Sequence, residues 1–484
     1  MTRKTLRILR PVLTVLGLAT LAACGGGDSV QAPPAEPTRS QDARVFAPVV
    51  EATFAALGGS TVDTDRWTGV LNNAAYRIEV PKTGWNGKLV MWVHGYRGTG
   101  PNLTVDNPIM RRYLLDNGYA WAASSYSKNY YDVRAGVEDT NALALSFSTI
   151  ATAKGRPLVM PSKIFITGVS MGGHITGAAI DAEAQATSIN KVKYAGAVPM
   201  CGVMGDTELF NYFGGYQVAA QQLAGVPITR FPTTDFAALT PTIQAALWST
   251  FPTQTNAQGD KLKNVVMNLS GGDRPFFKEG WANASNQNNI FSSLGGDGTI
   301  NGILTDNVLD TTSLFYKVDA ASTATTSVDT AFNTAAFKIT PTADANRLRR
   351  DGLRWIPSTG ANINIPVVSL HTLGDLFVPF KMEQVYFDRA KAKGTDKFLV
   401  QRAIRDVGHC AFTAAEATTA FDDMVKWEAG GPKPAGDDVK TAATLASPTY
   451  GCAFTKNTTS AEDYTFPPTV RAAFQAGYPA CPAN

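Results

Sequence analysis

Apolar residues recur along this chain in short runs that alternate with segments of helical spacing. The runs are rich in β-branched and aromatic residues and predict strands at residues 75–80, 88–93, 119–126, 164–166, 193–201, 365–371 and 398–404. Residues 135–153 carry apolar side chains at helical spacing, and Thr413 with Glu416 makes a T-x-x-E capping box before another predicted helix. This alternation predicts an α/β fold with a mostly parallel central sheet flanked by helices.

The alternation stops in a middle block, residues 202–364, which separates two of the predicted strands. The block contains glycine turns, a polar run near residues 320–327 and clusters of aromatic residues. Because structureless loops of this length are uncommon within domains, we expect a largely helical cap inserted over one end of the sheet. The aromatic residues are expected mainly in the core of that cap: Phe210, Tyr212, Phe213, Tyr216, Phe276, Phe277 and Trp281.

Composition indicates a globular protein rather than a disordered or nucleic-acid-binding one. The chain has 484 residues, of which 44% are hydrophobic and 17% charged, enough for one large or two ordinary domains. The formal net charge is +3, but four positive charges lie within the first ten residues, and without them the charge is about −1. No basic footprint for nucleic acid remains.

The N-terminus reads as an export leader. The basic residues precede an apolar run, residues 11–19, which is too short to span a membrane and typical of a signal peptide. Leu21-Ala22-Ala23-Cys24 resembles the lipobox of bacterial lipoproteins, which implies cleavage after residue 23 and lipid attachment at Cys24; a buried Cys in a core helix is the alternative. We therefore expect a protein anchored to the cell envelope, in the outer membrane if the host has two membranes, or secreted. Residues 24–45 would form a flexible tether.

The segment Gly168-Val169-Ser170-Met171-Gly172 fits the pattern G-x-S-x-G and follows a predicted strand. This pattern places a serine at a strained strand-to-helix turn, where glycines leave room and the hydroxyl is exposed. The helix start also presents unpaired N–H groups to a developing oxyanion. A glycine-rich turn whose serine only caps the helix is the alternative interpretation.

Three further segments follow predicted strands in the same manner. His94-Gly95-Tyr96-Arg97-Gly98 follows residues 88–93, a glycine loop with Asp375 follows residues 365–371, and Asp406-Val407-Gly408-His409-Cys410 follows residues 398–404. With the G-x-S-x-G turn, these segments resemble the α/β-hydrolases over roughly residues 75–201 and 365–428. The resemblance implies that fold, with residues 46–201 and 365–430 as two parts of the core and the cap inserted before the strand that carries the acid.

The resemblance also implies a catalytic triad in the chain order serine, acid, histidine. Ser170 would be the nucleophile, Asp375 the acid and His409 the base; of the four histidines, His409 alone follows Asp375. Asp406 and Asp206 remain alternatives for the acid.

The N–H groups of Met171 and Tyr96 would form the oxyanion hole, unless the segment around His94 is an ordinary turn with a structural histidine. No cofactor is required, and the sequence contains no phosphate loop or dinucleotide fingerprint.

Four cysteines besides Cys24 indicate two disulfides in an exported protein, although three pairings are possible. Cys201 ends a strand-like run and Cys410 follows the expected base, so both should lie at one edge of the sheet. We therefore favour Cys201 with Cys410, and Cys452 with Cys481, the latter stapling a C-terminal tail at residues 431–484. Metal binding by these cysteines is the competing interpretation, but no C-x-x-C or H-x-x-x-H pair supports it.

Three classes of function are compatible with these features. The favoured class is an exported, cofactor-free hydrolase of carboxylic esters with apolar, possibly polymeric, substrates. The second is a serine peptidase of the same fold, and the third is a non-catalytic surface-binding lipoprotein on a hydrolase scaffold.

Overall fold

A computed structural model describes residues 35–296, 299–457, 460, 462 and 468–481, so Cys24 and the leader lie outside the described residues. Residues 38–484 form one unit, to which the following description applies. A central sheet of eight strands runs through it in the order β12-β11-β8-β7-β4-β6-β3-β2. The strands are β2 (Thr64–Leu71), β3 (Ala74–Pro81), β4 (Lys88–Val93), β6 (Ala120–Ser124), β7 (Lys163–Val169), β8 (Gly196–Met200), β11 (Val367–Thr372) and β12 (Leu399–Ile404).

The sheet is mostly parallel. Strand β3 runs antiparallel to β2 and to β6, and every other neighbouring pair is parallel. Strands β8 and β11 are neighbours, although residues 202–364 lie between them in the sequence. The parallel arrangement brings the carboxyl ends of β4, β7, β11 and β12 to one edge, where ligand sites of open α/β sheets are found.

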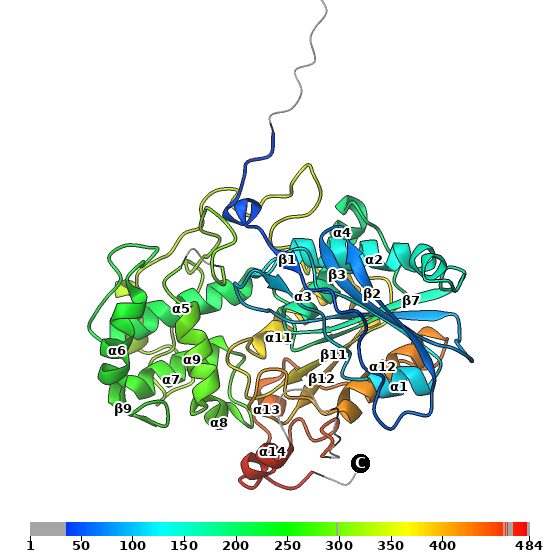
Figure 1. Ribbon diagram of the computed structural model, residues 1–484. Helices are drawn as coiled ribbons and strands as arrows, with labels where there is room; N and C mark the ends of the chain where they lie inside the picture. The colour runs from blue at the N-terminus through cyan, green and yellow to red at the C-terminus, as the bar shows by residue number, and fades with distance from the viewer. Residues whose placement is uncertain (1–34, 297–298, 458–459, 461, 463–467, 482–484) are drawn as a thin grey trace, which may run out of the picture. The chain divides into compact units, whose positions relative to one another are not determined.

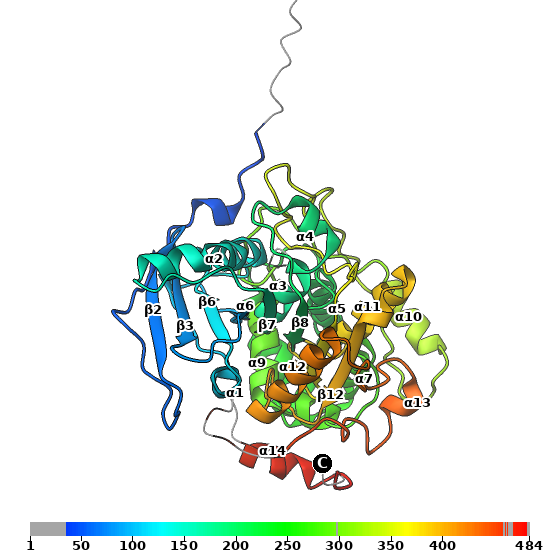
Figure 2. The ribbon, with the colours of Figure 1, turned by 90° about the vertical axis from the view of Figure 1, so that its right-hand side faces the viewer.

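Both faces of the sheet are covered by helices, because successive strand residues point to opposite faces (Figure 2). In β4, Leu89 and Met91 pack into the cluster that includes α2 (Val133–Ala153) and α3 (Met171–Ala179). Val90 and Trp92 pack into the opposite cluster with α1 (Arg111–Asp116) and α12 (Ala414–Glu428). The capping box predicted at Thr413 and Glu416 begins α12.

The middle block contributes helices that gather beside the sheet, drawn in green in Figure 1. They are α5 (Glu208–Leu223), α6 (Phe236–Leu247), α7 (Ala257–Leu269), α8 (Phe277–Trp281) and α9 (Ala284–Ser293), followed by α10 (Ser327–Ala335). The expected aromatic residues are buried: the Trp281 ring stacks on Tyr216 and on Trp248. In the described residues from Leu294 to Asn364, α10 is the one α-helix, so this half of the block is less helical than we expected.

The C-terminal segment packs against the end of the sheet. Cys452 forms a disulfide with Cys481, and the buried Arg405 donates to the carbonyls of Tyr450 and Pro479 at 2.9 and 3.0 Å. The other disulfide joins Cys201 to Cys410. Two disulfides are typical of proteins that fold in oxidising compartments. Among the described residues, no helix is long and apolar enough to cross a membrane.

Candidate active site

Ser170 lies at the turn between β7 and α3, with φ 58° and ψ −123°. Such a backbone conformation is rare for a residue with a side chain and is typical of strained functional turns. A Cβ atom at Gly172 would lie 2.0 Å from the Val93 carbonyl oxygen, and one at Gly168 would lie 2.5 Å from it. Both glycines of the pattern are therefore required by the close approach of β4.

The structure brings Ser170, His409 and Asp375 together from three loops at the carboxyl edge of the sheet. The Nε2 atom of His409 is 2.7 Å from Ser170 Oγ, and its Nδ1 atom is 2.5 Å from Asp375 Oδ2. The second oxygen of Asp375, which is fully buried, accepts the N–H groups of Phe377 and Val378 at 2.9 and 3.0 Å. A carboxylate held in this way fixes the tautomer in which the Nε2 lone pair faces the serine hydroxyl.

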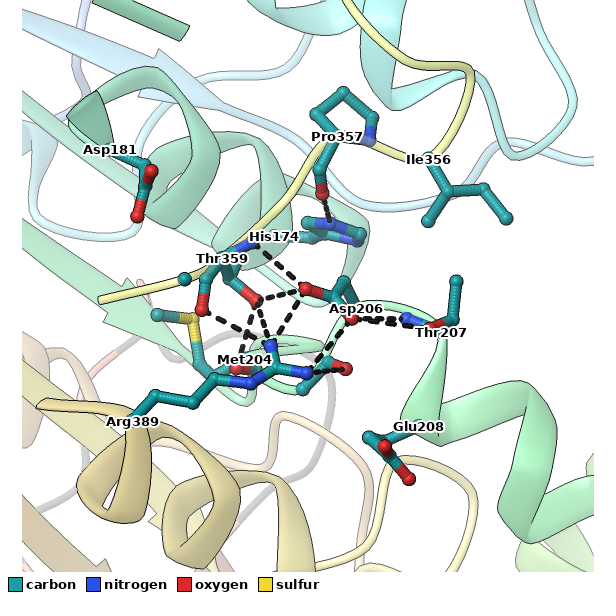
Figure 3. Close-up of polar contacts among 12 residues, drawn as sticks. His174, Asp181, Met204, Asp206, Thr207, Glu208, Ile356, Pro357, Thr359 and Arg389 are labelled. Carbon is teal, nitrogen blue, oxygen red and sulfur yellow. Dashed lines mark hydrogen bonds and ion pairs between the residues drawn. The ribbon is translucent and has the colours of Figure 1, made fainter. Parts of the chain in front are cut away.

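The two alternative acids have other partners. Figure 3 shows Asp206 paired with Arg389, 2.7 Å from its Nη1 atom, and accepting the Thr359 N–H at 3.1 Å. Asp406 lies 2.7 Å from the Nε atom of Arg471. Each of these ion pairs joins a loop to a helix, Asp206 to α11 (Lys381–Lys393) and Asp406 to α14 (Pro468–Gln475), whereas Asp375 directs its carboxylate at His409.

Two other histidines, His94 and His174, are held neutral by burial. Burial, aided by the positive charge of Arg97, lowers the pKa of His94 to about 4, and burial likewise lowers that of His174 to about 4. His174 donates through Nε2 to the Pro357 carbonyl at 2.8 Å (Figure 3), so its Nδ1 atom accepts the Tyr131 hydroxyl at 2.9 Å. These bonds give His174 a structural role at the base of α3.

The loop after β4 lies against the serine. A Cβ atom at Gly95 would be 3.1 Å from Ser170 Cβ, and Tyr96, the next residue of this loop, lines the same cavity as Ser170. Within the described part of the chain, no intramolecular hydrogen bond uses the N–H of Tyr96 or of Met171. Both donors are therefore available to an oxyanion, and their role in an oxyanion hole stays a prediction.

The Cys201–Cys410 disulfide lies beneath this site. The Ser170 N–H approaches Cys201 Sγ at 3.3 Å, and Cys410 Sγ is 3.4 Å from His409 Nε2. Of the described residues, these two cysteines and His409 form the one cluster with the spacing of metal ligands. Because the sulfurs are bonded to each other, they offer no thiolates, which are the ligand form of cysteine.

A cavity of about 330 Å³ opens at Ser170. Its lining from the sheet loops is Gly95, Tyr96, Val169, Ser170, Phe377, His409 and Cys410, and from the middle block Asn289, Ser292, Ser293, Ile300 and Asn301. A second cavity of about 500 Å³ shares Ser292, Ser293 and Asn301 with the first and reaches the start of α6 at Phe236 and Ala237. The first cavity is a cleft between the catalytic loops and the middle block, and the second adjoins it within the middle block.

Comparisons with known proteins give partial and distant similarities. No family model matches the chain. A segment of 62 residues is 34% identical to the o-phthalyl amidase of Xanthobacter agilis, covering 13% of this chain and 14% of that protein. Feruloyl esterase B of Aspergillus oryzae superposes over 82% of this chain and 87% of its own, with 15% identity and a TM-score of 0.41. The acylaminoacyl peptidase of Pyrococcus horikoshii superposes over 79% and 44%, with 11% identity and a TM-score of 0.37.

The sheet itself decides the fold. In chain order, β2 and β3 form an antiparallel pair at one end of the sheet, β6 lies beside β3, and β4 lies beyond β6. The strained turn with Ser170 follows β7, the fifth strand of the sheet. The chain has the α/β-hydrolase fold.

Within this α/β-hydrolase fold, the residues that sequence reasoning missed lie in the cleft. Phe377 contacts the His409 ring edge to face at 5.5 Å, and its place two residues after Asp375 was the available signal. Asn301 forms a hydrogen bond with the Tyr96 hydroxyl across the cleft, and no sequence pattern marked it. The aromatic residues of the middle block that the sequence singled out are absent from the described lining of the catalytic cavity.

Proposed function

We propose that this protein is an exported serine hydrolase that cleaves carboxylic esters through an acyl-enzyme intermediate. The observation that carries the proposal is the hydrogen-bonded chain from Ser170 through His409 to Asp375 at the mouth of the cleft. A non-catalytic binding lipoprotein would have no need of this arrangement, so we set that alternative aside.

In the proposed reaction, His409 Nε2 takes the proton of Ser170 while the serine oxygen attacks the ester carbonyl carbon. The N–H groups of Met171 and Tyr96 stabilise the resulting oxyanion. The C–O bond to the alcohol then breaks, and His409 gives the proton to the departing oxygen. Water, deprotonated by His409, attacks the acyl group, and the acid leaves as Ser170 regains its proton. Atoms and protons balance without a cofactor.

The cleft supports substrates with one small and one extended side. The lining of the catalytic cavity combines the apolar side chains of Val169, Ile300 and Phe377 with serine and asparagine side chains of the middle block. The second cavity continues away from the catalytic loops, which suits a long or polymeric ester. An apolar acyl or alcohol group would therefore bind against the residues around Phe377 rather than against the aromatic core of the middle block.

A serine peptidase of the same fold is the second candidate, and amide-cleaving proteins occur among the similar chains. Peptidases of this fold normally anchor a charged end of the peptide. Of the residues described as lining the catalytic cavity, none is Asp, Glu, Lys or Arg. This lining favours esters, whose alkoxide leaves more readily than an amine.

The test is to label the protein with a fluorophosphonate probe and to compare kcat/KM for matched ester and aminoacyl-anilide substrates. We expect covalent labelling that is absent in Ser170→Ala, and a ratio that favours the ester. A folded protein that takes no label would refute the serine mechanism, and a ratio favouring the anilide would replace the esterase with a peptidase.

We further propose that Cys24 carries a lipid anchor, in accordance with the sequence of the leader and the oxidised cysteines of the folded unit. Cells grown with labelled palmitate should yield a labelled protein whose label disappears in Cys24→Ser. An unlabelled wild-type protein in the medium would instead identify a secreted form.

A further inference from the structure

A second histidine lies directly behind the acid of the proposed triad. His371 is on β11, four residues before Asp375, and its side chain is 0% exposed. Its Nε2 atom donates to the Val378 carbonyl at 2.7 Å, which fixes the loop that holds Asp375. The same Nε2 atom is 3.8 Å from Asp375 Oδ2. The rings of His371 and His409 therefore both approach the same oxygen of Asp375.

The other ring nitrogen of His371 faces a buried carboxylate. Its Nδ1 atom is 3.4 Å from Oε1 of Glu383, a residue of α11 (Lys381–Lys393) with a side chain only 1% exposed. Gln401 donates one amide to Glu383 Oε2 at 2.5 Å and to the Glu383 carbonyl at 2.7 Å, and Ser369 donates to Oε1 at 2.5 Å. Both carboxylate oxygens therefore act as acceptors, as those of an ionised acid do.

These contacts determine the protonation of the ring. Nε2 faces a carbonyl oxygen, which only accepts, so Nε2 carries hydrogen. Nδ1 is buried and makes no hydrogen bond to a described residue, and the charged atom nearest to it is the Glu383 carboxylate oxygen at 3.4 Å. A hydrogen on Nδ1 would turn this contact into an attraction, whereas a lone pair there would face a negative charge. A ring with hydrogen on both nitrogens is an imidazolium cation.

We propose that His371 and Glu383 form a buried imidazolium–carboxylate pair whose positive end faces Asp375 and sets the pH range in which His409 acts as a base. The charge pair is independent of the proposed function; its effect on His409 rests on that function. His371 is a positioning residue, because it acts on His409 through Asp375.

The electrostatics of the surroundings agree with this geometry. Burial acts to lower the pKa of His371, but the carboxylates of Glu383 and Asp375 outweigh it, so the pKa is raised above its ordinary value. Among the described residues, the other ionisable groups that face the pair or Asp375 are Arg274, which precedes α8, His409, and the hydroxyls of Tyr212, Tyr386 and Tyr450. Burial raises the pKa of these three hydroxyls, so they stay neutral.

The pair should reduce the electrostatic stabilisation that Asp375 gives to protonated His409. Its positive end lies 3.8 Å from Asp375 Oδ2, so it offsets part of the negative charge that favours the imidazolium form of His409. Glu383→Gln removes the counterion and returns the buried His371 to neutrality. The acidic limb of the kcat/KM profile should then move to higher pH by roughly half a unit.

The charge itself can be read by NMR of the full chain with 15N-labelled histidine, since there are only four histidines. At a pH just above the ordinary histidine pKa of about 6.5, we expect one side chain to remain mostly in the imidazolium form, which disappears in His371→Gln and becomes neutral in Glu383→Gln. Four neutral imidazoles in the wild-type protein would overturn the proposal. This measurement needs no substrate, so its outcome is separate from that of the esterase assay.

Ser369→Ala is the matched control for the pH profile, because it removes a hydrogen bond from the same carboxylate without changing a charge. We expect Glu383→Gln to move the acidic limb and Ser369→Ala to leave it in place. If the acidic limb of the kcat/KM profile lies at the same pH in both variants, the pair has only a structural role. If Glu383→Gln does not fold, the same comparison is made with His371→Gln, whose amide can still donate to the Val378 carbonyl.

Discussion

Asp375 and Asp406 are two buried carboxylates near the loop of His409, and their partners distinguish them. Asp375 contacts the imidazole through one oxygen and two backbone N–H groups through the other. Asp406 caps its own loop through the N–H groups of Val407 and Gly408 and pairs with Arg471. Their different surroundings give a direct test of the proposed acid.

Asp375→Asn should reduce kcat by roughly 10⁴-fold, because an amide cannot hold the required imidazole tautomer. Asp406→Asn should leave kcat near the wild-type value but destabilise the fold by about 3 kcal/mol, since it leaves Arg471 with an incomplete buried ion pair. Steady-state kinetics with an aryl ester and urea unfolding measure the two effects. Comparable losses of kcat in the two variants would contradict the assignment.

Single residues could be predicted where a short sequence motif or a position directly after a strand marks them. Ser170 is marked by its glycines, and His409 by its position after the last strand. Asn301 and Ile300 could not be predicted, because they reach the cleft from a segment of the middle block without regular periodicity. His371 could be seen beside the acid, but its contact with Glu383 depends on how α11 packs on β11.

At the scale of elements, the turn from β7 into α3 offers a comparison between two glycines of the same helix. A Cβ atom at Gly172 would strike the backbone oxygen of Val93, whereas one at Gly177 would meet the methyl group of Met204 at 2.7 Å. A strand carbonyl cannot move away, but a methionine side chain can adopt another rotamer.

Gly172→Ala should therefore abolish most ester hydrolysis and lower the melting temperature, because α3 must shift away from β4. Gly177→Ala should retain activity and lose at most about 1–3 kcal/mol of stability through overpacking. Thermal unfolding and kcat/KM together check this. Full activity in Gly172→Ala would show that the turn tolerates a side chain.

The two disulfides attach different loops, so they should differ in their effect on catalysis. Cys201–Cys410 ties the end of β8 to the residue after His409, across 209 residues of sequence. Cys452–Cys481 closes 29 residues of the tail. The double variant Cys201→Ala/Cys410→Ala should lower kcat as well as stability, since the His409 loop loses its covalent support.

The double variant Cys452→Ala/Cys481→Ala should lower stability, by about 2–5 kcal/mol, with kcat nearly unchanged. Activity per folded molecule, measured below the melting temperature of each variant, separates the two. Equal kcat values in both variants would mean that packing alone positions His409.

Predicted and observed elements differ mainly at the edges of the fold. The central strands were predictable because they are continuous apolar runs, buried on both faces. Strand β2 was not predicted, because its residues TDRWTGVL are half exposed at the sheet edge and lack a clear apolar run. The loop segments of the middle block are positioned by contacts with α5 and α6, such as that of Leu309 with Gly214 and that of Gly295 with Phe236. These contacts join residues far apart in the sequence, so a local sequence pattern does not predict them.

At the scale of the whole molecule, the neutral buried histidines predict how stability depends on pH. The pKa of His174 is about 4 when folded and near 6.5 when unfolded, so between these values the unfolded chain binds a proton that the folded chain does not. Stability should therefore fall as pH drops from 6.5 toward 4, by up to about 3 kcal/mol for this residue. Asp139 opposes the trend, because burial raises its pKa to about 6.

His174→Gln removes the titrating group while keeping a donor for the Pro357 carbonyl. Urea unfolding at pH 7 and pH 5 should show a smaller loss of stability in this variant than in the wild-type protein. Equal losses would mean that His174 titrates alike in the folded and unfolded states.

The Cys201–Cys410 disulfide also makes completion of the site depend on the cell compartment in which the chain folds. A newly made chain in a reducing cytosol has thiols at these positions, so its histidine loop is not yet fastened to the sheet. If the proposed export takes place, oxidation in the new compartment would fasten that loop, and the proposed hydrolysis would begin only there. Protein purified from a reducing cytosol should accordingly gain specific activity on oxidation, and unchanged activity would show that the chain matures without regard to its location.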